Sequence, residues 1–273
     1  MTGNELRQRI RDGQRVYGSL IVADSPRWLG IIEATGLDFV FIDIEHISID
    51  RKTLSWMCLA YRQLGKPPIV RIPSPDPYEA TKALDAGACG ILSPYMEKIE
   101  DVERLISAVK IRPFKGQKAV DLVSGSFEPE SPLKKYLENH NKDHLLLINI
   151  ESRTGVENMD KLLAYDALDG IIVGPHDLSC SYDMPEAYDD RRFVDLVSTI
   201  MKKARGMSKG AGIHVTFDAI DQEIEWAKAG ANIILHKADI ILFREHIERE
   251  LNQIRSALGE TTDRESEKKN INI

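Results

Sequence analysis

The sequence predicts a single α/β barrel in which eight parallel strands alternate with helices. Its 273 residues suit one such barrel. Short apolar runs alternate with longer amphipathic segments, and eight is the number of strands at which such a barrel closes. Most runs are continuously apolar, as is typical of parallel strands covered on both faces. The expected strands are, in chain order, residues 16–22, 38–44, 67–72, 90–95, 145–151, 169–175, 212–217 and 232–237.

Helices are expected between these strands, and three of them carry end signals. SPRWLGIIEATG begins with Ser25 as a candidate N-cap and ends at Gly36. DPYEATKALDAG begins at Asp76 and ends at Gly87, and AIDQEIEWAKAG ends at Gly230. A helix that ends in glycine just before an apolar run is the pattern of a βα unit.

Two regions depart from this alternation. Residues 111–143 are too long and too polar for a simple connection, and such segments are often functional or packed against a neighbour. A last helix is expected over about 238–258, and residues 259–273 hold too few large apolar side chains to pack. We therefore expect one domain over residues 1–258 and a disordered tail over 259–273.

Composition indicates a soluble intracellular protein. The net charge of −7 argues against nucleic acid or an anionic membrane surface as a partner. Three cysteines without metal-ligand spacing suit reduced thiols in the cytoplasm. The charged N-terminus lacks the apolar core of a signal peptide, and no apolar run is long enough to cross a membrane. The expected partners are small molecules.

Polar side chains gather where the expected strands end. In a barrel of this kind the active site lies at the C-terminal ends of the strands, so closure brings these side chains around one mouth. The residues concerned are Asp43, Glu45 and His46 on the second strand, Arg71 on the third, Asn149 and Glu151 on the fifth, and Gly174, Pro175, His176 and Asp177 on the sixth.

Glu151 and Asp177 are the candidate metal ligands. Two carboxylates on adjacent strand ends make a good site for a hard cation, and an oxygen-only set suits Mg²⁺ or Mn²⁺. Both acids have a structural alternative, which is to cap the helices that follow. Glu151 ends a very apolar strand, where an unpaired carboxylate would be unfavourable.

Arg71 and His46 also have two interpretations. Arg71 is either a catalytic group or the ion-pair partner of Asp43 or Glu45. His46 is either a structural histidine or a proton acceptor whose basicity is raised by a neighbouring carboxylate. Several polar strand ends in succession favour the catalytic interpretation of His46.

The chain resembles the HpcH/HpaI aldolase family of class II 2-oxo acid aldolases. The resemblance spans about residues 15–257 and rests on DFVFIDIEH, VRIP, EATKALDAGACGILSPY, INIES with TGVENMD, and GIIVGPHDLS, in that order. It implies a TIM barrel of the phosphoenolpyruvate/pyruvate type whose C-terminal helix is swapped between the subunits of a homo-oligomer, usually a hexamer.

The resemblance also implies roles for individual residues. Glu151 and Asp177 match the metal-binding carboxylates, with Mg²⁺ expected first and Mn²⁺ or Co²⁺ as alternatives. His46 matches the general base, and Arg71 the residue that steadies the enolate and carbonyl oxygens. Asp85 matches the acid that raises the basicity of the histidine, a role that rests on resemblance alone. Asp43 is counted with this catalytic set.

Some pocket residues depart from the family pattern. Asn149 stands where a glutamine is usual, His176 replaces a small residue, and His236 occupies a usually small position. The leading hypothesis is a metal-dependent lyase that joins or cleaves a 2-oxo acid and an aldehyde. One alternative is a condensing enzyme such as a siderophore-pathway citrate synthase, which joins oxaloacetate and acetyl-CoA, or a lyase like the citrate lyase β subunit. A third is a non-catalytic barrel.

Overall fold

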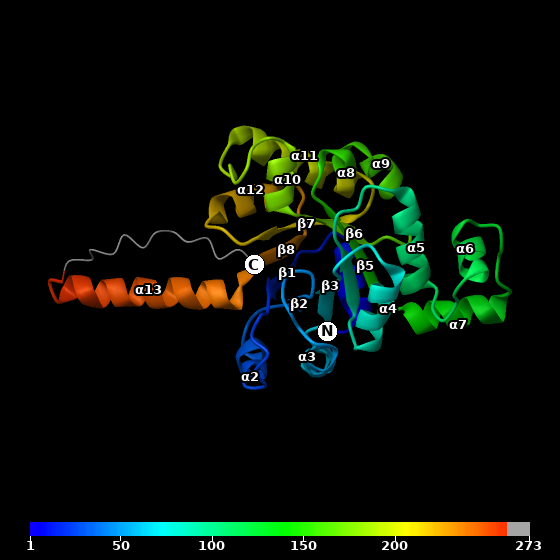
Figure 1. Cartoon of the computed structure of the whole chain (residues 1–273), viewed down its shortest axis with the longest axis horizontal. Coiled ribbons are helices and arrows are strands. Elements are labelled where there is room, and N and C mark those ends of the chain that lie inside the picture. The colour runs from blue at the N-terminus through cyan, green and yellow to red at the C-terminus, as the bar shows by residue number, and fades with distance from the viewer. Residues whose placement is uncertain (261–273) are drawn as a thin grey trace.

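The computed structural model describes residues 1–260 and confirms the predicted fold class. Eight parallel strands form a closed barrel in which each strand pairs with the next and β8 pairs with β1 (Figure 1). β7 begins two residues before the expected run. The strands are β1 (Val16–Leu20), β2 (Phe39–Asp43), β3 (Pro68–Arg71), β4 (Gly90–Ser93), β5 (Leu145–Ile150), β6 (Gly170–Val173), β7 (Gly210–Val215) and β8 (Ile233–Ala238).

Helices follow the strands and cover the outside of the barrel (Figure 1). They are α1 (Gly3–Arg11), α2 (Trp28–Glu33), α3 (Arg51–Gln63), α4 (Pro77–Asp85), α5 (Ile99–Lys110), α6 (Gln117–Val123), α7 (Ser131–Asn141), α8 (Arg153–Glu157), α9 (Met159–Leu162), α10 (Pro175–Ser181), α11 (Arg191–Gly206), α12 (Ile220–Ala229) and α13 (Asp239–Ala257). These are all the helices of residues 1–260, and none of them is long and apolar enough to cross a membrane.

The predicted ends are confirmed for two of the three helices and are wrong for the third. The Asp76 carboxylate accepts the Tyr78 amide at the start of α4. Gly87 and Gly230 have φ values of 108° and 130°, in the region that favours glycine. α2 is shorter than expected, because it begins after Arg27 and its C-cap is Ala34. Ser25 and Gly36 therefore do not bound it.

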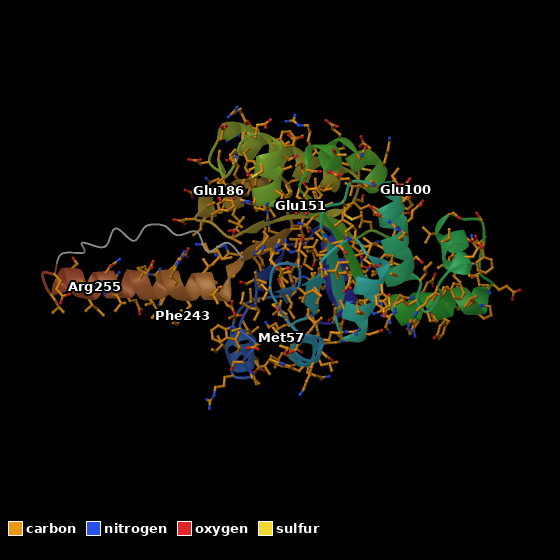
Figure 2. All side chains as sticks on the ribbon, viewed as in Figure 1. Met57, Glu100, Glu151, Glu186, Phe243 and Arg255 are labelled. Carbon is orange, nitrogen blue, oxygen red and sulfur yellow. The ribbon has the colours of Figure 1, made fainter. Side chains whose placement is uncertain are left out.

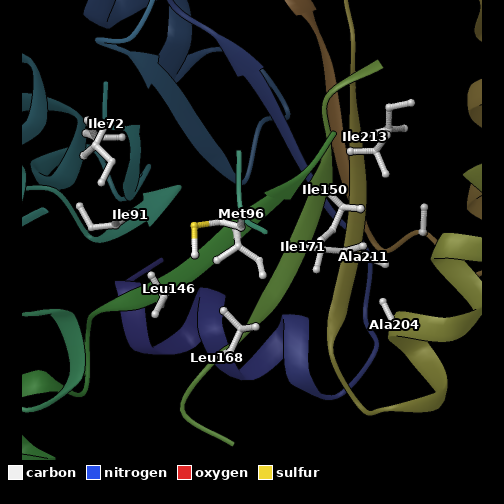
Figure 3. Packing of buried hydrophobic residues seen from close by; sticks show 14 of the residues in the cluster. Ile72, Ile91, Met96, Leu146, Ile150, Leu168, Ile171, Ala204, Ala211 and Ile213 are labelled. Atoms are coloured by element: carbon white, nitrogen blue, oxygen red, sulfur yellow. The ribbon is translucent and has the colours of Figure 1, made fainter. Parts of the chain in front are cut away.

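The strands alternate between two apolar layers, although the sequence shows continuous apolar runs. In β2, Phe39 and Phe41 join the cluster inside the barrel, whereas Val40 and Ile42 join the layer between strands and helices. Figure 3 shows part of that outer layer, including Ile91 and Leu146. Because side chains alternate along a strand, Asp43 follows Phe39 and Phe41 toward the barrel interior.

α1 closes the end of the barrel where the strands begin, a role that no pattern in the sequence predicted. Its Leu6 and Ile10 are fully buried in the inner cluster. Arg7 and Arg11 each place Nε 2.8 Å from Asp169 Oδ1, and Lys110 of α5 pairs with the other carboxylate oxygen. The N-terminal end of the barrel is therefore filled by apolar side chains and by a buried ion cluster.

Two segments extend from the barrel on opposite sides (Figure 1). Residues 111–143, predicted to be more than a simple connection, contain α6 and α7, which contact α5. α13 projects away from the barrel, and Figure 2 shows Phe243 and Arg255 along it. The tail predicted over 259–273 falls almost wholly on residues 261–273, outside the described residues.

The beginning of α13 is attached to the barrel by two acidic side chains. Asp239 accepts hydrogen bonds from the backbone amides of Val22 and Ala23, which follow β1. Glu245 receives Lys237 Nζ on both of its oxygens, at 2.7 and 2.8 Å. These contacts fix the direction in which the helix leaves β8.

Candidate active site

β2 and β3 place Asp43 and Arg71 opposite one another at the mouth of the barrel. Arg71 donates from Nε to Asp43 Oδ1 at 3.0 Å and from Nη2 to Oδ2 at 2.5 Å. Burial alone would raise the pKa of Asp43, but the hydrogen bonds and charge of Arg71 bring that pKa below its ordinary value. The bidentate pair fixes the guanidinium in one plane, so the ion-pair interpretation of Arg71 is correct and does not exclude a catalytic one.

Glu45 lies between Arg71 and His46. Its Oε2 is 3.1 Å from Arg71 Nε and 3.6 Å from His46 Nε2. Burial raises the pKa of Glu45 to about 7, with the Arg71 charge opposing the shift and the charges of Asp43 and Asp177 adding to it. The His46 side chain is half-exposed. His46 thus has a carboxylate neighbour on its own segment and open access to the mouth.

Glu151, at the end of β5, is buried and held from two sides. The Tyr95 amide donates to Oε1 at 2.5 Å, and Asn149 Nδ2 donates to Oε2 at 2.9 Å. Gly174 leaves the space that this carboxylate fills, because a Cβ there would lie 2.1 Å from Oε2. Ser152, not Glu151, caps α8 by accepting the Gly155 amide. The capping alternative for Glu151 is therefore wrong.

The charges around Glu151 leave its carboxylate without full compensation. Burial raises its pKa to about 7. The Tyr95 hydrogen bond and the Arg71 charge oppose that shift, whereas the charges of Asp177 and Glu45 increase it. A cation bound beside this carboxylate would remove the imbalance.

Asp177 lies in the first turn of α10 and is exposed to the mouth. Its charge acts on both Glu45 and Glu151, so the two predicted metal ligands lie close enough for their charges to interact. Within residues 1–260, no helix amide donates a hydrogen bond to Asp177, so Asp177 does not cap α10 in that way. The neighbouring His176 lies 3.7 Å from Glu186 and 3.5 Å from the Tyr188 hydroxyl.

Asp85 is the predicted site residue that the described chain does not bring to the mouth. α4 runs from the mouth back to the opposite end of the barrel and ends at Asp85, which is exposed and pairs with Arg112. Within one chain, the carboxylate beside His46 belongs to Glu45. The role of Asp85 toward the histidine stays a prediction, since one chain alone does not bring the two side chains together.

Sequence reasoning left three contributors without a role in the site. Glu45 was noted at the strand end and as a possible ion-pair partner of Arg71, but it was given no catalytic role. The Tyr95 contribution is a backbone amide, which leaves no mark in residue type. His214 follows the inward alternation of β7 and lies against Phe41, with ring centroids 5.4 Å apart. Burial, aided by the Arg71 charge, lowers the pKa of His214 to about 4, so it is neutral beneath Arg71.

The candidate metal ligands at the mouth are the carboxylates of Glu151 and Asp177. Among residues 1–260, no group of three or more His, Cys, Asp or Glu side chains converges as a metal site. Glu151 and Asp177 supply carboxylate oxygens only, and hard divalent cations in such sites complete their coordination with water and substrate oxygens. The buried, under-compensated carboxylate of Glu151, with the exposed carboxylate of Asp177 nearby, fits a cation of this kind.

Comparison with known proteins decides the family. The sequence profile of the HpcH/HpaI aldolase/citrate lyase family matches residues 18–245. The chain belongs to this family. Family membership places it among carbon–carbon lyases and favours an enzyme over the non-catalytic barrel.

Curated relatives and solved structures of the family resemble most of the chain. A 2-keto-3-deoxy-L-rhamnonate aldolase of Escherichia coli (strain K12) is 25% identical over 262 residues, covering 94% of this chain and 95% of the relative. A hydroxypyruvate/pyruvate aldolase of Roseobacter denitrificans is 28% identical over 242 residues, covering 88% and 92%. The crystal structure of citrate synthase SbnG has a TM-score of 0.78 and 26% identity, covering 93% of this chain and 99% of that one.

Proposed function

We propose that this lyase makes or breaks a carbon–carbon bond through the enolate of a 2-oxo acid, with a divalent metal ion and an aldehyde as the second substrate. One observation carries the proposal. Glu151 is buried at the barrel mouth with Asp177 and Glu45 as like-charged neighbours, and the charge of Arg71, which Asp43 holds in place, also acts on it. This arrangement suits a cation and an anionic substrate together.

Glu151 and Asp177 would hold the metal ion, with Mg²⁺ as the first candidate and Mn²⁺ or Co²⁺ as alternatives. When bound, such an ion acts as a Lewis acid on the keto oxygen of a pyruvate-like substrate. Asn149 keeps the Glu151 carboxylate in one orientation through its 2.9 Å hydrogen bond. The backbone between Gly174 and Asp177 would face the substrate carboxylate at the start of α10.

Arg71 would stabilise the developing negative charge, and His46 would transfer the proton. Negative charge grows on the keto oxygen as the bond breaks, and Arg71, already oriented by Asp43, would stabilise it without reorganisation. His46 would move the proton to or from the aldol hydroxyl, with Glu45 stabilising the protonated ring. We assign this partner role to Glu45 in place of Asp85.

A condensing reaction between oxaloacetate and acetyl-CoA is the second candidate. Asn149 is one methylene shorter than the glutamine usual in these aldolases, and its Oδ1 is buried without a hydrogen-bond partner. That unpaired acceptor is free for a donor on a different substrate. The likeness to a citrate synthase at 26% identity supports the same direction.

A two-part experiment tests the proposal. The purified chain, freed of metal and then supplied with Mg²⁺, Mn²⁺ or Co²⁺, is incubated with pyruvate in D₂O while the methyl proton signal is followed. Metal-dependent loss of that signal is expected, and its persistence with all three ions would contradict the enolate proposal. Mass spectrometry after addition of aldehydes, or of oxaloacetate with acetyl-CoA, then distinguishes the two candidate reactions.

We also propose that the chain works in the cytoplasm as a homo-oligomer, a hexamer by family resemblance, in which α13 packs on a neighbouring subunit. Three free cysteines suit a reducing compartment. The α13 side chains Phe243, Ile247, Leu251 and Ile254, and Leu258 at the C-cap of the helix, recur at helical spacing and are 40–70% exposed.

Light scattering coupled to size-exclusion chromatography tests this assembly. Phe243→Glu should shift the mass toward the monomer, because a charge would enter the apolar face of α13. The exposed control Glu248→Gln on the same helix should keep the wild-type mass. An unchanged mass for Phe243→Glu, or a monomeric wild type, would contradict the proposal.

A further inference from the structure

A cleft of about 580 Å³ opens at the end of the barrel opposite the candidate active site. Its walls come from the α1–β1 connection, the last turn of α11 and the turn between α12 and β8. We call it the basic cleft. Its defining residues are Gly13, Arg15, Arg205, Lys228, Gly230 and Asn232.

The basic cleft gathers positive charge that the chain does not neutralise. No acidic residue of the described part of the chain lines it, although the whole sequence carries a net charge of −7. Within residues 1–260, Arg15, Arg205 and Lys228 form no ion pair with a carboxylate. The nearby α1 arginines behave differently, since each of them is paired with Asp38 or Asp169. The three cleft cations are therefore available to an external anion.

Arg205 is held in place by two glycines and a carbonyl. Its Nη1 donates to the Lys209 carbonyl at 2.8 Å. A Cβ on Gly13 would lie 2.5 Å from Arg205 Nη2, and one on Gly230 would lie 3.1 Å from its Cγ. Both glycines have positive φ values, 78° and 130°. The backbone of these glycines leaves room for the Arg205 guanidinium. Its N–H groups other than the one bound to Lys209 do not donate to a carboxylate of residues 1–260.

The floor of the cleft is rigid. Asn232 Nδ2 donates to the carbonyls of Ile10 and Gln14 at 2.8 and 3.2 Å, and its Oδ1 accepts the Ala211 amide at 2.9 Å. This buried side chain joins the end of α1 to β7 and β8. A ligand would meet a preformed site, which reduces the ordering that binding requires.

We propose that the basic cleft is a second binding site, for an oxyanionic metabolite carrying a phosphate or several carboxylates. Arg205 supplies a fork of donors that matches a planar or tetrahedral oxyanion, while Arg15 and Lys228 supply charge at the rim. The proposal goes beyond the proposed lyase activity, because the cleft lies at the N-terminal ends of β1 and β8. It provides a place where a metabolite other than the substrate binds.

Isothermal titration calorimetry of the full-length, metal-free protein tests the site at low salt. Inorganic phosphate, pyrophosphate and tricarballylate are titrated separately, so that the phosphate and carboxylate forms of the ligand are distinguished. At least one should bind saturably, with an affinity that falls as salt is added. Arg205→Gln and Lys228→Gln should each weaken binding roughly tenfold. Lys202→Gln, an exposed position on α11 outside the cleft, should leave it unchanged.

Two outcomes would overturn the site. One is the absence of saturable binding in all three titrations. The other is binding that survives both cleft variants but disappears in Arg71→Gln, which would place the anion at the barrel mouth. Lys228 is exposed and has no partner to lose, so its variant remains informative even if Arg205→Gln folds poorly. Because no metal or turnover is involved, failure here is separable from failure of the lyase proposal.

Discussion

Glu151 and Asp169 are buried carboxylates at opposite ends of the same barrel, and their surroundings have opposite effects. Burial alone would raise both pKa values. At Asp169 the charges of Lys110, Arg7 and Arg11 outweigh burial and lower the pKa to about 2. At Glu151 burial and the like charge of Asp177 raise the pKa to about 7 despite Arg71 and the Tyr95 amide.

The difference separates a structural ion cluster from a site that is incomplete without a ligand. Asp169 receives its cations and the Leu146 amide from within the chain, so its charge is compensated on folding. Glu151 receives two hydrogen bonds but faces other acids, so its full compensation must come from outside. Titratable groups with a strongly shifted pKa, such as Glu151, cluster at functional sites.

The largest effect is expected for Glu151→Gln at the mouth. This change keeps the size of the side chain but removes a metal-binding charge, so metal-dependent methyl exchange should fall roughly 1,000-fold. Thermal unfolding should occur at or above the wild-type temperature, because a buried uncompensated charge is lost. Glu100→Gln, an exposed change on α5 labelled in Figure 2, is the matched control. Wild-type methyl exchange in the Glu151→Gln variant would contradict the assignment of Glu151 to a metal-binding site.

Asp169→Asn should have the opposite profile. It leaves Lys110 and two arginines without their buried partner, so the free energy of unfolding should drop by about 3 kcal/mol. Turnover per folded molecule should change little, because the mouth is untouched. Urea unfolding and active-site-normalised exchange measure the two quantities. The exposed Asp166→Asn is the control. A stable but inactive Asp169→Asn variant would contradict the structural role of Asp169.

Arg71→Lys should impair catalysis without affecting the opposite end. Lysine keeps the positive charge but cannot reproduce the bidentate contact with Asp43 or its fixed plane. We expect kcat to fall about 100-fold, with a smaller change in KM, in a steady-state assay of the reaction found by product analysis. Arg191→Lys, an exposed ion-paired arginine, is the control. An unchanged kcat would show that charge alone suffices at this position.

The smallest effects are expected in the pH dependence of stability, where the two ends differ in sign. The pKa of Asp169 is lowered from 3.8 to about 2, so its stabilisation is present above pH 3.8 and is lost as the pH falls toward 2. The pKa of Glu45 is raised from 4.5 to about 7, so stability falls as the pH rises from 4.5 to 7.

Urea midpoints of the metal-free protein across this range measure both slopes. Asp169→Asn should flatten the acidic limb, and Glu45→Gln should flatten the limb near neutrality. If Glu45→Gln left the neutral limb unchanged, the raised pKa assigned to Glu45 would be contradicted.

The barrel was predictable because its strands are apolar runs in the sequence. Glycines that end helices, such as Gly87 and Gly230, come shortly before some of these runs. The mouth residues were predictable for the same reason, since Asp43, Arg71 and Glu151 continue the inward alternation of their strands. The short α2 was mispredicted because Ser25 and Gly36 suit helix ends by type, and residue type does not reveal the local backbone path.

Contacts between distant segments were beyond the sequence. The Tyr95 amide reaches Glu151 through a backbone turn at φ 50°, and no residue type marks it. The compensation of Asp169 depends on α1, whose arginines resemble ordinary surface charge until the helix docks. Asp85 illustrates the reverse case, because a motif match suggested a contact that the path of α4 does not allow within one chain.

The attachment of α13 has a consequence for the behaviour of the enzyme on dilution. Asp239, at the first turn of that helix, holds the backbone of Val22 and Ala23 at the rim of the mouth. If the far part of α13 packs on a neighbouring subunit, dissociation of that subunit would loosen this rim segment as well. Specific activity should then decline as protein concentration drops below the dissociation constant of the assembly, with no change in any residue that touches the substrate.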